Sequence, residues 1–137
     1  MASTDANGSD ATMQFSTDGG SSWVTSGYYW NTHASTMDAT SYAANQGSNA
    51  ANIGIASGVG AASGEHWSGE IHLWGLPGSG IKSHANGTGG TSYVADSTNG
   101  RVARCHGYQN VAATHDAVKI SMSGLGGTFR LYGIVKS

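Results

Sequence analysis

Apolar and polar positions alternate over short stretches of this chain, and glycine-rich turns separate these stretches. The last of them, residues 127–136, places Phe129 and Leu131 on one parity and Arg130 on the other. Successive side chains of a β-strand point to opposite faces, so one row can meet a core while the other meets a groove or a neighbouring subunit. We predict a closing strand here, fed by a turn at residues 123–127 and tied into a sheet.

The same pattern predicts a hairpin near the start of the chain. Residues 12–16 alternate and then reach Asp18-Gly19, and an Asp-Gly turn between alternating runs is a strong hairpin signal. The return strand is expected at residues 23–30. Residues 31–51 are rich in Ala, Ser, Thr and Asn without an apolar period, which predicts a long loop of the kind that often carries function.

The rest of the chain continues as short strands and turns, with no periodic helix. Further strands are predicted at residues 52–56, 68–76, 81–85, 91–95, 101–108 and 117–122, with a turn at 86–90. Such spacing, punctuated by glycine, is typical of sandwiches and jelly rolls. We therefore predict an all-β protein: a single antiparallel, jelly-roll-like β-sandwich of about eight strands over residues 12–137. Residues 1–11 are small and polar, which predicts an arm or linker.

Charge is scarce in this chain. Charged residues make up 10% of the sequence, against about a quarter in typical globular domains. A surface of small, uncharged residues suits contact with neighbours in an assembly, or else a neutral secreted module. The net charge is −2 and the first eighty residues hold no Lys or Arg, which argues against nucleic acid as a partner.

The sequence also bears on membranes and location. No apolar run approaches the roughly 20 residues of a membrane span, so no membrane insertion is expected. The N-terminus lacks the basic and apolar regions of a signal peptide. A single cysteine, Cys105, cannot form an internal disulfide framework. These features fit a protein made in a bacterial cytoplasm and delivered by lysis.

Three motifs contain residue types that could carry chemistry. Residues 75–83 nearly match the pattern of a phosphate-binding loop, but Ile81 separates the second glycine from the lysine. A turn is therefore the better interpretation. Cys105 and His106 are adjacent on a predicted strand and point to opposite faces, so they cannot act as a nucleophile and its base. Glu70 and His72 share a strand face that could hold a divalent metal, although the spacing matches no closed metal motif. We expect no catalytic residue, metal or cofactor.

Aromatic residues crowd the first half of the chain. Such rings stack on sugars and also dominate protein interfaces, although some must fill the core of a domain with two phenylalanines. The candidates for an exposed cluster that binds glycan or another subunit are Tyr28, Trp30, Trp67 and Trp74. Core packing is the alternative for each of them.

Four motifs carry a family resemblance: Gly-Thr-Phe-Arg-Leu-Tyr-Gly-Ile at 127–134, Phe-Ser-Thr-Asp-Gly-Gly-Ser-Ser-Trp at 15–23, Ser-Gly-Tyr-Tyr-Trp at 26–30 and Gly-Glu-Ile-His-Leu-Trp at 69–74. Together they resemble a β-sandwich domain of tail-fibre and other virion surface proteins of tailed bacteriophages. The resemblance implies a non-enzymatic structural protein of the virion: a tail fibre, head fibre or capsid decoration. It also implies a homotrimer that contacts other virion proteins and serves host attachment.

One departure from that family and two alternatives stay open. Such domains usually begin with another strand pair before the Asp-Gly hairpin, so the chain is expected to be a fragment or to receive strands from elsewhere in an assembly. A carbohydrate-binding module or adhesin that recognises host surface glycan is the first alternative. A hydrolase is the second, but no readable element positions Glu65 and Glu70 as an acid–base pair.

Overall fold

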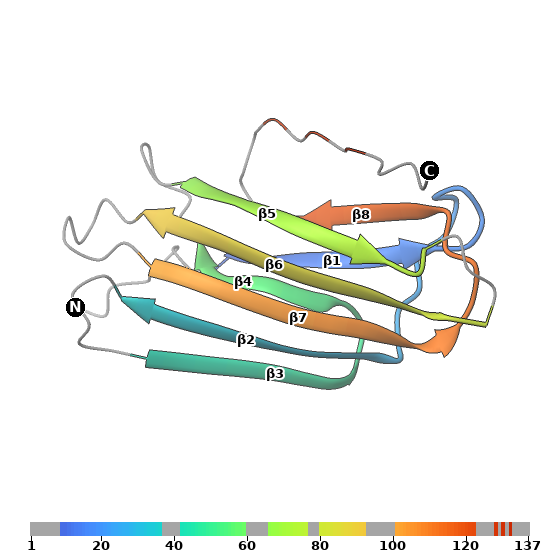
Figure 1. The fold of residues 1–137 in the computed structure, drawn as a ribbon, viewed down its shortest axis with the longest axis horizontal. Helices are drawn as coiled ribbons and strands as arrows, with labels where there is room; N and C mark the ends of the chain where they lie inside the picture. The colour runs from blue at the N-terminus through green and yellow to red at the C-terminus, as the bar shows by residue number, and fades with distance from the viewer. Residues whose placement is uncertain are drawn as a thin grey trace, which may run out of the picture.

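The protein is an all-β sandwich of two antiparallel sheets, as predicted (Figure 1). The computed structural model describes residues 9–36, 42–59, 66–76, 80–92 and 101–122, together with residues 128, 130 and 132. The strands of this described part are β1 (Ser9–Ser16), β2 (Tyr28–Thr36), β3 (Tyr42–Ala50), β4 (Ile53–Val59), β5 (His66–Trp74), β6 (Lys82–Ser92), β7 (Arg101–Ala112) and β8 (Ala117–Ser121). None of the described residues forms a helix, so none forms a helix long and apolar enough to cross a membrane.

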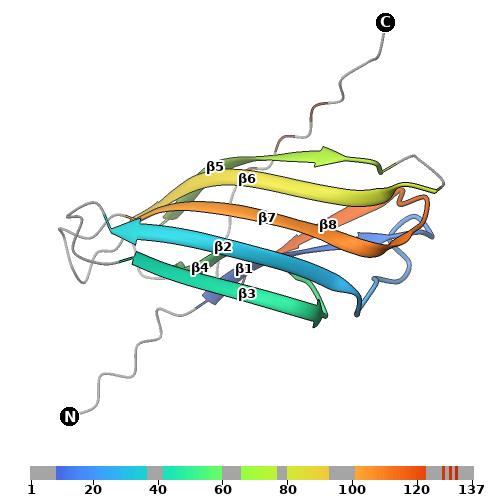
Figure 2. The same ribbon diagram turned by 60° about the horizontal axis from the view of Figure 1, so that its bottom comes forward.

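The two sheets differ in width. One holds β4, β1 and β8 in that order, and the other holds β3, β2, β7, β6 and β5. Figure 2 shows the five-stranded sheet as the broad layer, with the narrower sheet behind it. All pairings among the described strands are antiparallel, and at the centre of the broad sheet β2 pairs with β7 without interruption from Tyr28↔Gln109 to Thr36↔Arg101.

The core lies between the inner faces of the two sheets. Strand β7 shows the alternation that builds it, because Ala103 and Cys105 are buried while Arg104 between them is exposed. From the narrow sheet, Met13, Phe15 and Ile53 are fully buried and meet this face. Period-2 burial of one face is the physical reason why alternation in the sequence predicts these strands.

A buried tyrosine joins the two sheets beside the start of β4. The pairing of β1 with β4 stops at Met13↔Ile53, so β4 offers no partner to the backbone of Phe15. The Phe15 N–H instead donates to the Tyr28 hydroxyl at 2.7 Å, and the Phe15 carbonyl accepts from the Val24 N–H at 2.9 Å. Both polar groups of Phe15 are therefore satisfied inside the core.

The Asp-Gly turn forms, but the predicted hairpin does not. The Asp18 carboxylate accepts hydrogen bonds from the hydroxyl and N–H of Ser22 and from the Ser16 hydroxyl, and these bonds lower its pKa to about 2. Beyond this turn the chain crosses to the other sheet, where Gly27 adopts a positive φ of 79° just before β2. Strand β1 therefore pairs with β4 and β8 and not with β2.

Two other local predictions are wrong. Residues 31–51 do not form a loop over their described part, because β2 continues to Thr36 and pairs with β3. Residues 86–90 lie within β6 and form no turn. Glycines are needed inside β6 because a Cβ at Gly87 would lie 3.0 Å from the Cys105 Sγ, and one at Gly89 would lie 2.6 Å from the Trp67 Nε1.

Both ends of the chain also depart from expectation. Strand β1 begins at Ser9, inside the stretch predicted to be an arm, while residues 1–8 lie outside the described residues. At the other end, Thr128, Arg130 and Tyr132 are exposed and belong to no strand, and Tyr132 keeps 76% of its surface exposed. The closing strand is therefore wrong for these three residues, and the rest of that stretch lies outside the described part.

Candidate binding surfaces

The outer face of the five-stranded sheet carries a row of rings. Cross-strand pairing places Trp74 opposite His84, His84 opposite Tyr108, and Tyr108 opposite Tyr29. Ring centroids lie 5.5 Å apart for both His84–Tyr108 and Tyr29–Tyr108, and both pairs are stacked. We call these four residues the aromatic row. It crosses β5, β6, β7 and β2, and spans about three strand spacings, roughly 14 Å.

A polar row lies beside the aromatic row on the same face. His72, Asn86, His106 and Asn31 face one another across the same strands, and we call them the polar row. The His72 ring stacks on Trp74 at 6.0 Å, and the His106 ring lies 6.0 Å from that of His84. The two rows together, named here the outer platform, thus combine ring faces with imidazole and amide groups that both donate and accept hydrogen bonds.

Few charges border the outer platform. Lys82 places its Nζ 5.4 Å from the Tyr108 ring centroid and donates to the Asn110 side-chain oxygen at 2.7 Å. On the other side, Arg104 and the exposed Glu70 follow one row further along β7 and β5. The platform itself holds imidazole as its only titratable side chain besides tyrosine, so its interior suits a neutral partner.

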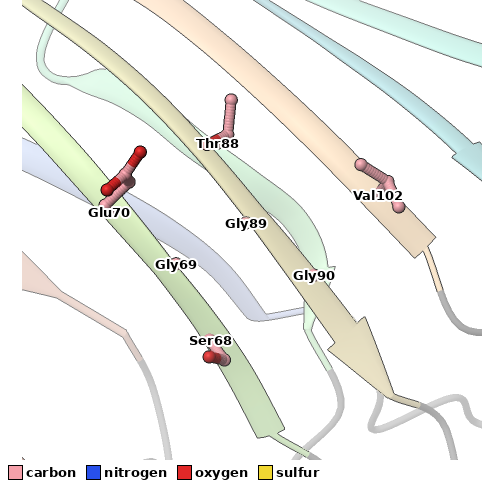
Figure 3. A pocket seen from close by; sticks show the side chains of 7 residues that line it. All are labelled: Ser68, Gly69, Glu70, Thr88, Gly89, Gly90 and Val102. Atoms are coloured by element: carbon pink, nitrogen blue, oxygen red, sulfur yellow. The ribbon is translucent and has the colours of Figure 1, made fainter.

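A shallow hollow of about 500 Å³ continues this face toward the other end of β5 and β6. Figure 3 shows the side chains of Glu70, Thr88 and Val102 standing around a floor of glycines. Trp67 packs beneath this floor on the inner side of the sheet, where Gly69 and Gly89 leave room for its ring. A Cβ at Gly69 would lie 2.7 Å from this indole, and one at Gly89 would lie 2.6 Å from it.

A second depression lies at one edge of the sandwich. We call it the edge cleft; it encloses about 300 Å³ between strands of both sheets. It is lined by Asp10, Thr12, Trp30, Thr32, Asn45, Gln46, Asn52, Gly54 and Ala56. At this edge the five-stranded sheet ends with β3 and the narrower sheet ends with β4. The broader sheet extends beyond the narrower one, so inward-facing side chains of β2 and β3 remain open to a cleft.

Glycines clamp the indole of Trp30 in the edge cleft. A Cβ at Gly47 on β3 would overlap the indole nitrogen, and one at Gly54 on β4 would lie 2.7 Å from the far edge of the ring. The Trp30 Nε1 is buried and finds no hydrogen-bond partner among the described residues, as is also true of Trp67. The ring therefore bridges strands of the two sheets in one fixed position.

The four aromatic candidates do not form one cluster. Tyr28 is fully buried at 0% exposure, and burial raises the pKa of its hydroxyl, so its assignment to an exposed cluster is wrong. Trp30 lies in the edge cleft, and Trp67 packs half-buried against the core beneath the glycine hollow. Trp74 is 50% exposed and belongs to the outer platform. Sequence reasoning missed Tyr29, His84 and Tyr108, because only the strand register brings them together.

The other chemical candidates are placed as follows. Glu70 and His72 do share a face, with 3.5 Å between the Glu70 Oε1 and the His72 Nε2. Within the described ranges, no group of three His, Cys, Asp or Glu side chains could hold a metal ion. Cys105 is buried, which raises its thiol pKa, while His106 is exposed on the opposite face.

One serine–histidine pair escaped the sequence analysis. The Ser83 Oγ lies 2.7 Å from the His115 Nδ1, but Ser83 is fully buried and His115 nearly so. Phe15 packs on the His115 ring with centroids 5.1 Å apart, and burial lowers the imidazole pKa despite the opposing charge of Asp116. A substrate cannot reach this serine in the folded chain, so the pair acts as a core hydrogen bond.

Comparison with known proteins finds no matching family model, no matching curated protein and no matching solved structure.

Proposed function

We propose that this chain is a non-enzymatic structural protein of a phage virion, from a tail fibre, head fibre or capsid decoration, and that it acts by self-assembly and surface attachment. The outer platform is the observation that carries the proposal. It presents Trp74, Tyr108 and Tyr29 at the surface of the broad sheet. Aromatic residues are enriched at protein interfaces, and charges are depleted from interface centres.

The size of the broad face also fits an interface. Five strands spaced by about 4.8 Å and about nine residues long give a face of roughly 600 Å². A stable interface buries about 800 Å² on each partner. The face thus supplies most of the required area, and we propose that it meets neighbouring copies in a homotrimer while loops meet other virion proteins.

A charge placed in the middle of the platform tests this assembly. Asn31 is exposed in the polar row on β2, so Asn31→Glu leaves the core of the sandwich unchanged. A carboxylate buried without a partner costs several kcal/mol in an interface. Thr25→Glu is the matched control, since Thr25 is exposed on the connection between β1 and β2.

The readout is particle mass by light scattering on a size-exclusion column. We expect the wild-type chain and Thr25→Glu to give three times the chain mass of 13.9 kDa, and Asn31→Glu to give the single-chain mass. A wild-type particle of one chain mass at high concentration would contradict the proposal. So would an Asn31→Glu particle that keeps the wild-type mass.

A carbohydrate-binding module or adhesin is the second candidate function. It is supported by Trp74, which is half-exposed and stacks on the imidazole of His72, so that a ring face and a hydrogen-bonding group lie side by side at the surface. Saturable sugar binding that Trp74→Ala abolishes is the expected result, with Ile81→Ala as a control because Ile81 is an exposed apolar residue outside the platform. An absence of binding across a broad glycan panel would contradict this candidate.

A further inference from the structure

We infer that the edge cleft is a binding site for a neutral saccharide, separate from the outer platform. The inference deepens the carbohydrate-binding candidate and does not depend on assembly through the platform. The cleft has a depth that the platform lacks, because its floor is built from buried residues: Thr32 is 3% exposed and Ala56 is 2% exposed. Its volume of about 300 Å³ is at the lower end for small-molecule sites.

The lining combines one ring with many small polar groups. The amides of Asn45 and Asn52 can each donate and accept hydrogen bonds, and the hydroxyls of two threonines can do the same. A sugar presents hydroxyl groups that likewise donate and accept, together with apolar C–H faces. An aromatic wall beside several hydrogen-bonding side chains suits both properties, and Trp30 supplies that wall.

Charge narrows the class of ligand. Among the described residues of the lining, Asp10 is the only ionisable side chain, and none of them is a lysine or an arginine. An anionic ligand such as a phosphate ester would be repelled by this carboxylate and would find no cation to pair with. A neutral sugar can instead donate a hydroxyl to the carboxylate, as charge-assisted hydrogen bonds favour.

The walls of the cleft are held in place before any ligand arrives. Gly47 and Gly54 fix the Trp30 ring between β3 and β4. The turn that joins these strands is anchored twice: the Gln14 side-chain amide donates to the Ala51 carbonyl at 3.0 Å, and the Gly27 N–H donates to the Asn49 side chain at 3.0 Å. A preformed site loses less conformational entropy on binding, which raises affinity for a small ligand.

An added peptide strand fits this surface less well. Strand addition relies on backbone pairing along an open edge and on pockets for alternate side chains. The walls here carry polar side chains on β1, β2 and β3, and the indole of Trp30 fills the space beside β4. The lining therefore favours the saccharide.

The four tryptophan side chains allow a direct test. In ¹⁵N-labelled protein each indole N–H gives its own resonance, so Trp30 reports on the edge cleft while Trp74 reports on the outer platform. The probes are free hexoses, 6-deoxyhexoses, N-acetylhexosamines and pentoses, with glycerol as the control for general polyol effects. We expect at least one sugar class to shift the Trp30 resonance saturably, whether or not the Trp74 resonance moves.

The exposed rim of the cleft provides the variant. Asn45→Ala with Asn52→Ala should weaken the sugar affinity by about fivefold for each hydrogen bond lost. Thr25→Ala is the control, because Thr25 is an exposed polar residue on the connection between β1 and β2, outside both the cleft and the outer platform. The inference is overturned if no sugar shifts the Trp30 resonance, or if the double variant binds like the wild type. It is also overturned if the resonance responds to protein concentration alone, which would make the cleft an interface between copies.

Discussion

Replacing Tyr28 with phenylalanine tests the link between the two sheets. The hydroxyl of Tyr28 accepts the Phe15 N–H at 2.7 Å inside the core, at a point that β4 does not reach, so β4 offers no alternative partner. Tyr28→Phe keeps the ring and removes only this acceptor. A buried N–H left without a partner costs about 1–3 kcal/mol, so the free energy of unfolding should fall by about that amount.

Equilibrium unfolding in urea measures this loss, and a second tyrosine provides the control. Tyr29 is the next residue along β2 but points outward and stacks on Tyr108, so Tyr29→Phe should change stability by no more than about 0.5 kcal/mol. For a chain of this length, Tyr28→Phe should lower Tm by roughly 3–10 °C. Amide exchange at Phe15 should also become faster in Tyr28→Phe alone.

Comparing the two variants shows whether the buried hydrogen bond of Tyr28 stabilises the fold. If Tyr28→Phe and Tyr29→Phe unfold at the same urea concentration with the same slope, the buried hydrogen bond does not stabilise the fold. If Tyr28→Phe loses stability but the Phe15 amide stays protected, the loss comes from packing and the argument from an unpaired N–H is refuted.

Three further predictions concern single side chains. Burial lowers the pKa of His115 below its ordinary 6.5, so as the pH falls the unfolded chain binds the proton before the folded chain does. The free energy of unfolding should therefore decrease as the pH drops below about 6.5. Urea unfolding at a series of pH values should show a smaller decrease for His115→Gln. Gly89→Ala should destabilise the fold by about 1–3 kcal/mol because its Cβ would meet Trp67. Gly90→Ala is the control and should change the urea midpoint little, since its Cβ would lie 3.5 Å from the nearest atom. Equal midpoints for the two variants would refute the packing argument. The Asp18 carboxyl should titrate at a pKa of about 2 by NMR. Its contribution to stability is therefore fully present above pH 3.8 and is lost as the pH falls toward 2. A carboxyl that titrates near 3.8 would show that the turn hydrogen bonds are absent in solution.

The sequence determined the fold class through local alternation. Strands such as β7 can be recognised from residues 101–108 alone, because one face is buried at every second position. The Asp18 turn is equally local, since its carboxylate binds groups two to four residues away. These features need no knowledge of the partner strands, which is why an all-β sandwich follows from the pattern.

Tertiary packing decided the strands that lack an apolar pattern. Strand β3 is mostly exposed and built from small polar residues, so it forms because β2 offers it a backbone edge. Strand β6 runs through Gly87 and Gly89, which resemble a turn in the sequence but are required beneath the Cys105 and Trp67 side chains. Glycine signals a turn and a close approach alike, and only the neighbouring side chains distinguish them.

The candidate surfaces divide in the same way. The sequence could identify Trp74 and Trp30 as large aromatic residues, but it could not show which tyrosine of the pair Tyr28 and Tyr29 points inward. That choice depends on how the chain crosses from one sheet to the other at Gly27. The outer platform depends on register between strands up to eighty residues apart, and register follows from the pairing of the whole sheet. Local sequence fixes which side chains alternate, whereas the partners across each strand exist only in the folded structure.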